Sequence, residues 1–183
     1  MVGHGDREGH QLAGDDARRR GRFRDLEIGP SDDAEFLRRV TLDGEAAPLV
    51  GQVLLDLTAD LEFDAVGGLT MGADPVAASM LHAAAARGRT LDAFVVRKAA
   101  KAHGLQRRVE GPEIKGRRVL VVEDTSTTGG SPLTAVEAVR EAGAEVVAVA
   151  TIVDRATGAD QKIREGAGVP YLFAFSKDEL GLD

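Results

Sequence analysis

The fold of this chain is decided by residues 119–131, which read VLVVEDTSTTGGS. The first four residues are aliphatic, a composition typical of a strand that is buried on both faces of a sheet. Two carboxylates, four hydroxyl residues and two glycines follow, and we expect Ser131-Pro132 to cap a helix that ends at Gly143. A buried strand, a polar glycine-rich turn and a helix in this order predict one unit of a parallel α/β sheet.

The alternation of strands and helices extends over the chain from about Leu37. Short apolar runs predict strands at 63–66, 93–96, 118–122, 146–153 and 171–175, and periodic apolar faces predict helices at 45–61, 74–86 and 159–165. Asp74 is a candidate N-cap with Pro75 in the first helical position, and 98–116 is expected to be a long loop. We therefore expect an α/β fold, a parallel sheet flanked by helices, whose ligands bind at the carboxyl ends of the strands.

The composition argues against several classes of protein. No run of 18 apolar residues exists, and the first 16 residues lack the apolar core of a secretory signal. The absence of cysteine excludes disulfides, thiol catalysis and thiolate metal sites. The net charge of −7 and the lack of Trp argue against a general nucleic-acid binder. We expect a soluble cytoplasmic protein with no membrane or nucleic-acid partner.

The first 36 residues differ from the rest of the chain. They hold 9 acidic residues, 6 arginines and 6 glycines, with few large apolar groups and no helical or strand period. Such a segment buries too little apolar surface to offset the entropy of ordering. We expect residues 1–36 to form a poorly ordered leader and residues 37–183 to form one domain.

Three polar segments follow expected strands and carry the candidate chemistry. In 123–131, glycines and hydroxyls beside a helix N-terminus suit a phosphate, while the two carboxylates suit sugar hydroxyls, directly or through Mg²⁺. Residues 97–108 hold five of the 23 Lys and Arg residues, which indicates an anionic target. Residues 67–75 form a second glycine-rich turn before a helix. Each segment also has an interpretation without a ligand: 123–131 could be an acidic turn, 97–108 a solvated basic loop and 67–75 an ordinary glycine-rich turn.

Residues 121–131 resemble the phosphoribosyl-pyrophosphate (PRPP) motif of type I phosphoribosyltransferases. The spacing Arg-Lys-x-x-Lys-x-His-Gly at 97–104 is similar to the catalytic loop of orotate phosphoribosyltransferases, and 37–183 resembles their actinobacterial type. The resemblance implies the Rossmann-like type I phosphoribosyltransferase fold. It also implies a glycosyltransferase reaction in pyrimidine (UMP) synthesis, in which PRPP and orotate give orotidine 5′-phosphate and pyrophosphate. Residues 28–36 do not match the base-capping segment of that family.

The resemblance also implies roles for individual residues. The implied catalytic residues are Lys101, His103 and Asp124. The implied PRPP-binding residues are Arg97, Lys98, Lys101, His103, Glu123, Asp124, Thr125, Ser126, Thr127, Thr128, Gly129, Gly130 and Ser131. The implied pyrophosphate loop is Gly68, Leu69 and Thr70, and the implied orotate contacts are Thr128 and Arg155. Mg²⁺ would be bound mainly through the substrate, without dedicated protein ligands.

Two further features qualify the resemblance. Many family members have a lysine where Met71 stands, and Arg155 could instead be an ordinary surface ion-pair partner.

The family resemblance implies a homodimer in which the basic loop reaches the partner's site. The alternatives are a phosphoribosyltransferase for another base, a non-catalytic PRPP-binding regulator and a folded but inactive relative. The Lys-x-x-Lys-x-His segment favours an enzyme, because a regulator has no need of it.

Overall fold

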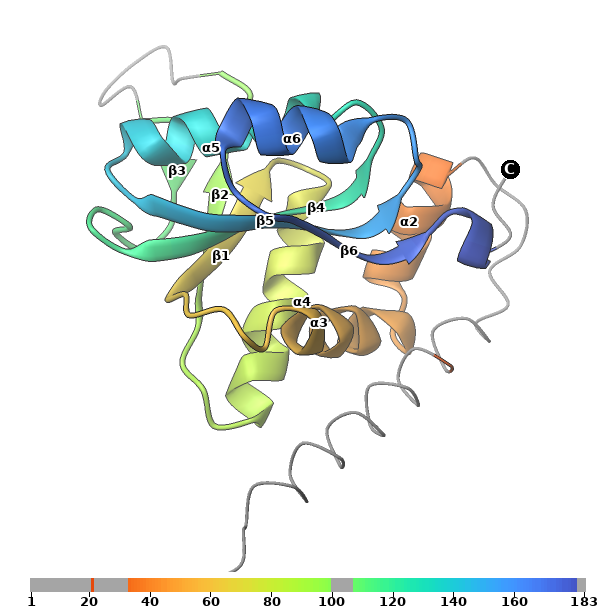
Figure 1. Ribbon diagram of the computed structural model, residues 1–183. Helices are drawn as coiled ribbons and strands as arrows, with labels where there is room; N and C mark the ends of the chain where they lie inside the picture. Colours follow the sequence, from red (N-terminus) through yellow and green to blue (C-terminus); the bar gives the residue numbers. More distant parts are fainter. Residues whose placement is uncertain (1–20, 22–32, 100–106, 181–183) are drawn as a thin grey trace, which may run out of the picture.

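The computed structural model describes residues 21, 33–99 and 107–180, which form one six-stranded sheet covered by helices (Figure 1). The strands are β1 (Ala65–Leu69), β2 (Asp92–Val96), β3 (Val109–Glu110), β4 (Arg118–Ser126), β5 (Glu145–Asp154) and β6 (Tyr171–Ser176). The helices are α2 (Asp33–Leu42), α3 (Ala46–Leu57), α4 (Ala73–Ala86), α5 (Gly130–Glu141) and α6 (Ala159–Ala167), with a 3₁₀ turn η1 (Asp178–Leu180).

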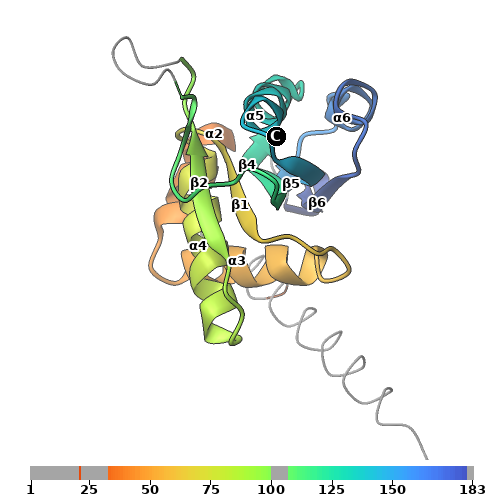
Figure 2. The ribbon, with the colours of Figure 1, turned by 90° about the vertical axis from the view of Figure 1, so that its left-hand side faces the viewer.

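The sheet separates two hydrophobic cores, one on each face. Helices α2, α3 and α4 pack on one face, and α5 and α6 pack on the other, as Figure 2 shows in a view turned by 90°. Buried side chains of the central strands alternate between the two cores: Leu120 and Val122 contribute to one, Val119 and Val121 to the other. This arrangement confirms the expected α/β fold with helices on both faces.

The strand order β3-β2-β1-β4-β5-β6 places a switch point between β1 and β4. From β1 the chain proceeds to β2 on one side, and from β4 it proceeds to β5 and β6 on the other. All strand pairs are parallel except β2–β3. In open parallel sheets, the crevice beyond the carboxyl ends of the strands at such a point is where ligands bind.

Several local features differ from the sequence expectations. The segment 98–116, expected to be a loop, contains the short strand β3, and strand β4 extends four residues past Val122. Helix α5 begins at Gly130 after Gly129, which has a left-handed φ of 74°, so the expected cap at Ser131 is wrong. The expected cap at Asp74 is wrong as well, because α4 begins one residue earlier at Ala73.

Helix α2 begins at Asp33, inside the segment expected to be a leader. Its buried residues Leu37 and Val40 pack into the core beneath β4 and β5. Among the described helices, none has the length and apolar character needed to cross a membrane.

Candidate active site

The site predicted from the sequence lies where β1, β4 and β5 end, which we call the carboxyl edge. Glu123 and Asp124 belong to the last part of β4 and are 6% and 9% exposed. A Cβ atom on Gly72, in the turn between β1 and α4, would lie 2.3 Å from Glu123 Oε1 and 2.9 Å from Asp124 Oδ1. The glycine therefore lets the β1–α4 turn lie directly against the two carboxylates. In the sequence, this turn and the pair of carboxylates belong to separate motifs.

Asp74 is a third carboxylate at this point, and we call Asp74, Glu123 and Asp124 the acidic trio. Asp74 Oδ2 accepts a hydrogen bond of 2.7 Å from the Thr70 hydroxyl, whereas its buried Oδ1 has no partner within the described residues. The sequence treated Asp74 only as a helix cap. The signal that could have located it is the hydroxyl four residues before it in the glycine-rich turn.

The acidic trio is electrostatically unfavourable in the protein alone. Burial, the largest cause, raises the pKa of Glu123 to about 8, and the charges of Asp124 and Asp74 act in the same direction. In the described part of the chain, no Lys, Arg or His forms an ion pair with any member of the trio. Buried carboxyl groups without an ion-pair partner are a feature of ligand-binding sites, because a ligand can supply the missing donors.

The turn after β4 presents a helix N-terminus beside the acidic trio. Thr127 and Thr128 are exposed there, while Gly129 is buried with its left-handed φ, and the free N–H groups of α5 follow. Such a terminus attracts anions through its amides and dipole. The other two hydroxyls of the motif lie differently: Thr125 Oγ1 donates to Val153 O at 3.3 Å, and Ser126 is buried.

The turn after β5 is joined to the turn after β4. The Arg155 N–H donates to Ser126 O at 3.3 Å, and the Thr157 hydroxyl donates to Thr127 O. Arg155 and Thr128, which the sequence paired as base contacts, therefore follow neighbouring strands at the same edge.

The basic segment after β2 is placed only in part. Arg97 lies at the end of β2, where its guanidinium pairs with Glu110 at 3.1 Å, and Lys98 is exposed. Lys101 and His103 lie outside the described residues. Gly68 and Leu69 are buried in β1, the Thr70–Met71 peptide is cis, and Met71 is 65% exposed.

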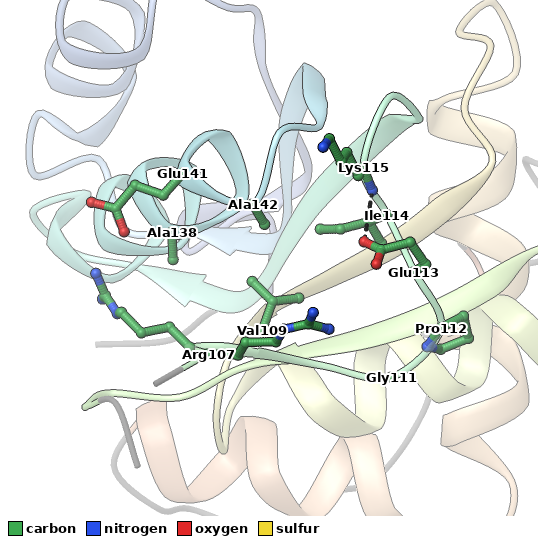
Figure 3. Close-up of a pocket in the computed structure, with 11 residues that line it drawn as sticks. Arg107, Val109, Gly111, Pro112, Glu113, Ile114, Lys115, Ala138, Glu141 and Ala142 are labelled. Carbon is green, nitrogen blue, oxygen red and sulfur yellow. Dashed lines mark hydrogen bonds between the residues drawn. The ribbon is translucent and has the colours of Figure 1, made fainter. Parts of the chain in front are cut away.

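A cavity of about 420 Å³ lies away from the acidic trio, beside β3 and the C-terminal end of α5 (Figure 3). Its charged lining comes from the side chains Arg107, Arg108, Glu113, Lys115 and Glu141. None of the site residues expected from the sequence lines it. Among the described residues, no three His, Cys, Asp or Glu side chains are grouped so that they could hold a metal ion by themselves.

Comparison with known proteins identifies the family to which this chain belongs. The model of the phosphoribosyl transferase domain matches residues 44–166. The chain belongs to the phosphoribosyltransferase family, and within it to the orotate phosphoribosyltransferases. The orotate phosphoribosyltransferase of Streptomyces coelicolor is 92% identical over 147 residues, which cover 80% of this chain and 81% of that protein. The enzyme of Corynebacterium glutamicum strain R is 60% identical over 147 residues, covering 80% of this chain and 78% of that protein.

Solved structures agree with this membership. The orotate phosphoribosyltransferase of Mycobacterium tuberculosis H37Rv in complex with PRPP has a TM-score of 0.77 and 49% identity, covering 97% of this chain and 99% of that one. A phosphoribosyltransferase from Corynebacterium diphtheriae has a TM-score of 0.81 and 51% identity, covering 90% of this chain and 99% of that one. The resemblance inferred from the sequence motifs is thereby confirmed.

Proposed function

We propose that this protein transfers the phosphoribosyl group of PRPP to orotate at the carboxyl edge, forming orotidine 5′-phosphate and pyrophosphate. The observation that carries the proposal is the acidic trio, which lacks a cation among the described residues and lies beside the N-terminus of α5. A phosphorylated sugar matches both parts, since its hydroxyls donate to carboxylates and its phosphate accepts from amides.

The 5-phosphate of PRPP belongs in the turn after β4, within residues 125–131. The exposed Thr127 and Thr128 hydroxyls and the first amides of α5 provide donors for it. The ribose hydroxyls then reach Glu123 and Asp124, the two carboxyl residues of β4 that precede residue 125. Asp124 acts as a catalytic residue by holding the ribose while positive charge develops on the ring.

The pyrophosphate belongs beside the β1–α4 turn, at Gly68, Leu69 and Thr70. Met71 supplies no charge there, so the neutralising cations come from the basic segment, namely Arg97, Lys98, Lys101 and His103. Lys101 is the main catalytic cation, because it stabilises the charge that grows on the departing pyrophosphate.

Mg²⁺ fits this edge as a companion of the substrate. The trio offers carboxylate oxygens, and the unpartnered Asp74 Oδ1 shows that one of them lacks a donor within the described residues. Mg²⁺ retains several waters and is held by one or two carboxylates together with substrate phosphates. When bound, it would neutralise charge on the pyrophosphate oxygens, with Glu123 and Asp124 holding the ribose beside it.

Orotate belongs beside Arg155 and Thr128, because a guanidinium fork matches a planar carboxylate or carbonyl edge. The catalytic domain spans residues 37–183, and the matched family region 44–166 lies within it. The assembly is a homodimer in which the basic segment of one subunit completes the site of the other. The enzyme works in the cytoplasm, a reducing compartment in keeping with a chain that lacks cysteine.

The test is an assay of purified protein with Mg²⁺, PRPP and each base in turn. Orotate should be the base consumed, and Lys101→Ala should lower kcat by roughly 10²–10³ with little change in PRPP binding. Lys115→Ala, at the separate cavity, is the matched control and should retain full activity. Consumption of another base would reassign the substrate, and PRPP binding without turnover of any base would indicate a regulator.

The shared site is tested by mixing two inactive variants, Lys101→Ala and Asp124→Asn. If the basic segment crosses the dimer interface, subunit exchange creates one intact site per hybrid and restores part of the activity. Absence of rescue after confirmed exchange would show that each subunit works alone.

A further inference from the structure

A buried polar cluster lies beneath the turn that carries Arg155. It consists of Ser126 at the end of β4, Thr151 and Asp154 on β5, and Tyr171 on β6, exposed by 1%, 0%, 9% and 2%. Polar groups buried at this depth are costly unless they are hydrogen-bonded. The proposed reaction assigns no step to Thr151, Asp154 or Tyr171, so their arrangement needs its own explanation.

Tyr171 is the centre of this buried polar cluster. Its hydroxyl donates to Asp154 Oδ1 at 3.0 Å and lies 3.0 Å from Thr151 Oγ1. Since the phenol has one proton and donates it to the carboxylate, the Thr151 hydroxyl must donate to the phenol oxygen. Burial raises the pKa of Tyr171, so the phenol keeps its proton and remains a donor at neutral pH.

Asp154 transmits this bond to the turn. Its second oxygen, Oδ2, accepts from the Ala156 N–H at 3.2 Å, and its carbonyl accepts from the Lys177 N–H at 3.0 Å. Ala156 has a φ of 55° and is the one non-glycine residue with positive φ in the described ranges. An alanine adopts this conformation only when its surroundings impose it.

The same turn is fixed from the opposite side by the end of β4. Arg155 donates its N–H to Ser126 O, and Thr157 bonds to Thr127 O. The Arg155 backbone is therefore held between the turn after β4 and the carboxylate that Tyr171 orients.

We propose that Tyr171 is a positioning residue for orotate: through Asp154 and Ala156 it sets the direction in which Arg155 meets a planar base that carries a carboxylate. The inference rests on the proposed contact between Arg155 and orotate. A phenylalanine at 171 would fill the same volume, but Asp154 Oδ1 would lose its donor and Thr151 its acceptor. The turn would then lose the orienting bond while the hydrophobic core stayed filled.

Tyr171→Phe tests this role through steady-state kinetics. The KM for orotate should rise by up to roughly tenfold, the upper bound set by one internal hydrogen bond to a charged group when its loss lets the Arg155 turn leave the binding orientation. The Kd for PRPP should change less than about twofold, because the exposed Thr127 and Thr128 hydroxyls proposed to hold the 5-phosphate make no hydrogen bond with Tyr171. Thr151→Ser, which keeps the donor, should behave like the wild type, and Thr151→Val should show a smaller rise in KM than Tyr171→Phe.

Val146→Ala is the matched control for a purely structural effect. Val146 is 5% exposed and lies on the same strand as Asp154, eight residues earlier, so its truncation should lower the melting temperature. Its KM for orotate should stay at the wild-type value. A Tyr171→Phe protein that melts earlier with an unchanged KM would overturn the inference.

Hydrogen exchange of the free protein separates this inference from the proposed function. Amides of residues 155–158 should exchange faster in Tyr171→Phe than in the wild type, and Val146→Ala should leave them unchanged. If the wild type does not use orotate, the proposed substrate is wrong, and the exchange result then decides the positioning role alone. Unchanged exchange in Tyr171→Phe would contradict it.

Discussion

The two halves of the carboxyl edge treat their carboxylates in opposite ways. Beside β1 and α4, the acidic trio has no ion pair within the described residues, one oxygen of Asp74 has no donor, and the pKa of Glu123 is raised to about 8. Beside β5 and β6, both oxygens of Asp154 accept hydrogen bonds, one from Tyr171 and one from Ala156.

Under the proposed function, this difference separates residues that bind the substrate from residues that hold the turn after β5 in place. An unsatisfied carboxylate destabilises the free protein and retains its capacity to bind, whereas a satisfied carboxylate stabilises the fold and is not available to a substrate. Removing charge should therefore have opposite effects on stability in the two halves.

The largest effect is expected from replacing the carboxyl groups of Glu123 and Asp124 with amides. In Glu123→Gln with Asp124→Asn, the Kd for PRPP should rise roughly 10²-fold, because the proposed hydrogen bonds of both carboxyl groups to the ribose hydroxyls are weakened. Calorimetric titration with PRPP measures this. Asp160→Asn, which breaks only the exposed pair with Arg164 on α6, is the control and should bind normally. Wild-type affinity in the double variant would remove the ribose assignment.

A smaller effect, on the free energy of unfolding instead of PRPP binding, is expected beside β5 and β6. Asp154→Ala should lower the free energy of unfolding by about 1–3 kcal/mol, because the buried Tyr171 hydroxyl loses its acceptor. Urea unfolding followed by circular dichroism gives this value. Glu62→Ala, which removes an exposed pair with Arg118, should cost less than about 1 kcal/mol. Equal costs in the two variants would refute the contrast.

The smallest effect is a dependence of the free energy of unfolding on pH, caused by Glu123. Its pKa is about 8 in the folded protein against an ordinary value of 4.5 for a glutamate carboxyl, so between these values the folded state holds a proton that the unfolded state has released. The stability contributed by that proton is complete below pH 4.5 and is lost as the pH rises toward 8.

The wild type should therefore lose stability relative to Glu123→Gln by at most about 1.4 kcal/mol per pH unit in this window. Urea unfolding of both proteins at pH 6.5 and 7.5 isolates the difference from other titrating groups. If the difference in unfolding free energy between the wild type and Glu123→Gln does not change with pH, Glu123 titrates normally.

Much of the framework could be predicted from local patterns. The apolar run before Glu123 indicated the central strand, and the glycines after Thr128 indicated the turn into a helix. Because carboxyl ends of parallel strands meet at one edge, the order of strands along the chain predicts that the turns after β4 and β5 are neighbours, whereas the roles of Thr128 and Arg155 follow only from the family resemblance.

Other features could not be predicted because they depend on backbone conformation or on strand register. Gly129 starts α5 through its left-handed φ, which the sequence does not encode as a cap. The bond between Asp154 and Tyr171 joins residues 17 apart on neighbouring strands. Helix α2 is not evident from residues 1–36 because only its first four residues lie there, while its buried residues, Leu37 and Val40, come after that boundary. The roles of all the individual site residues, those of Lys101 and His103 included, stay predictions.

The parallel pairing of β1 with β4 has a consequence for the order in which the protein matures. It joins Ala65 to Val119 across α4, β2 and β3, so closing it carries a larger chain-entropy cost than local pairings do. The acidic trio lies within residues 74–124, up to β4, whereas Tyr171, which we propose orients the Arg155 turn, lies on the last strand, β6, paired with β5. Under the proposed roles, the residues for the sugar phosphate therefore come earlier in the chain than Tyr171, which orients the base contact.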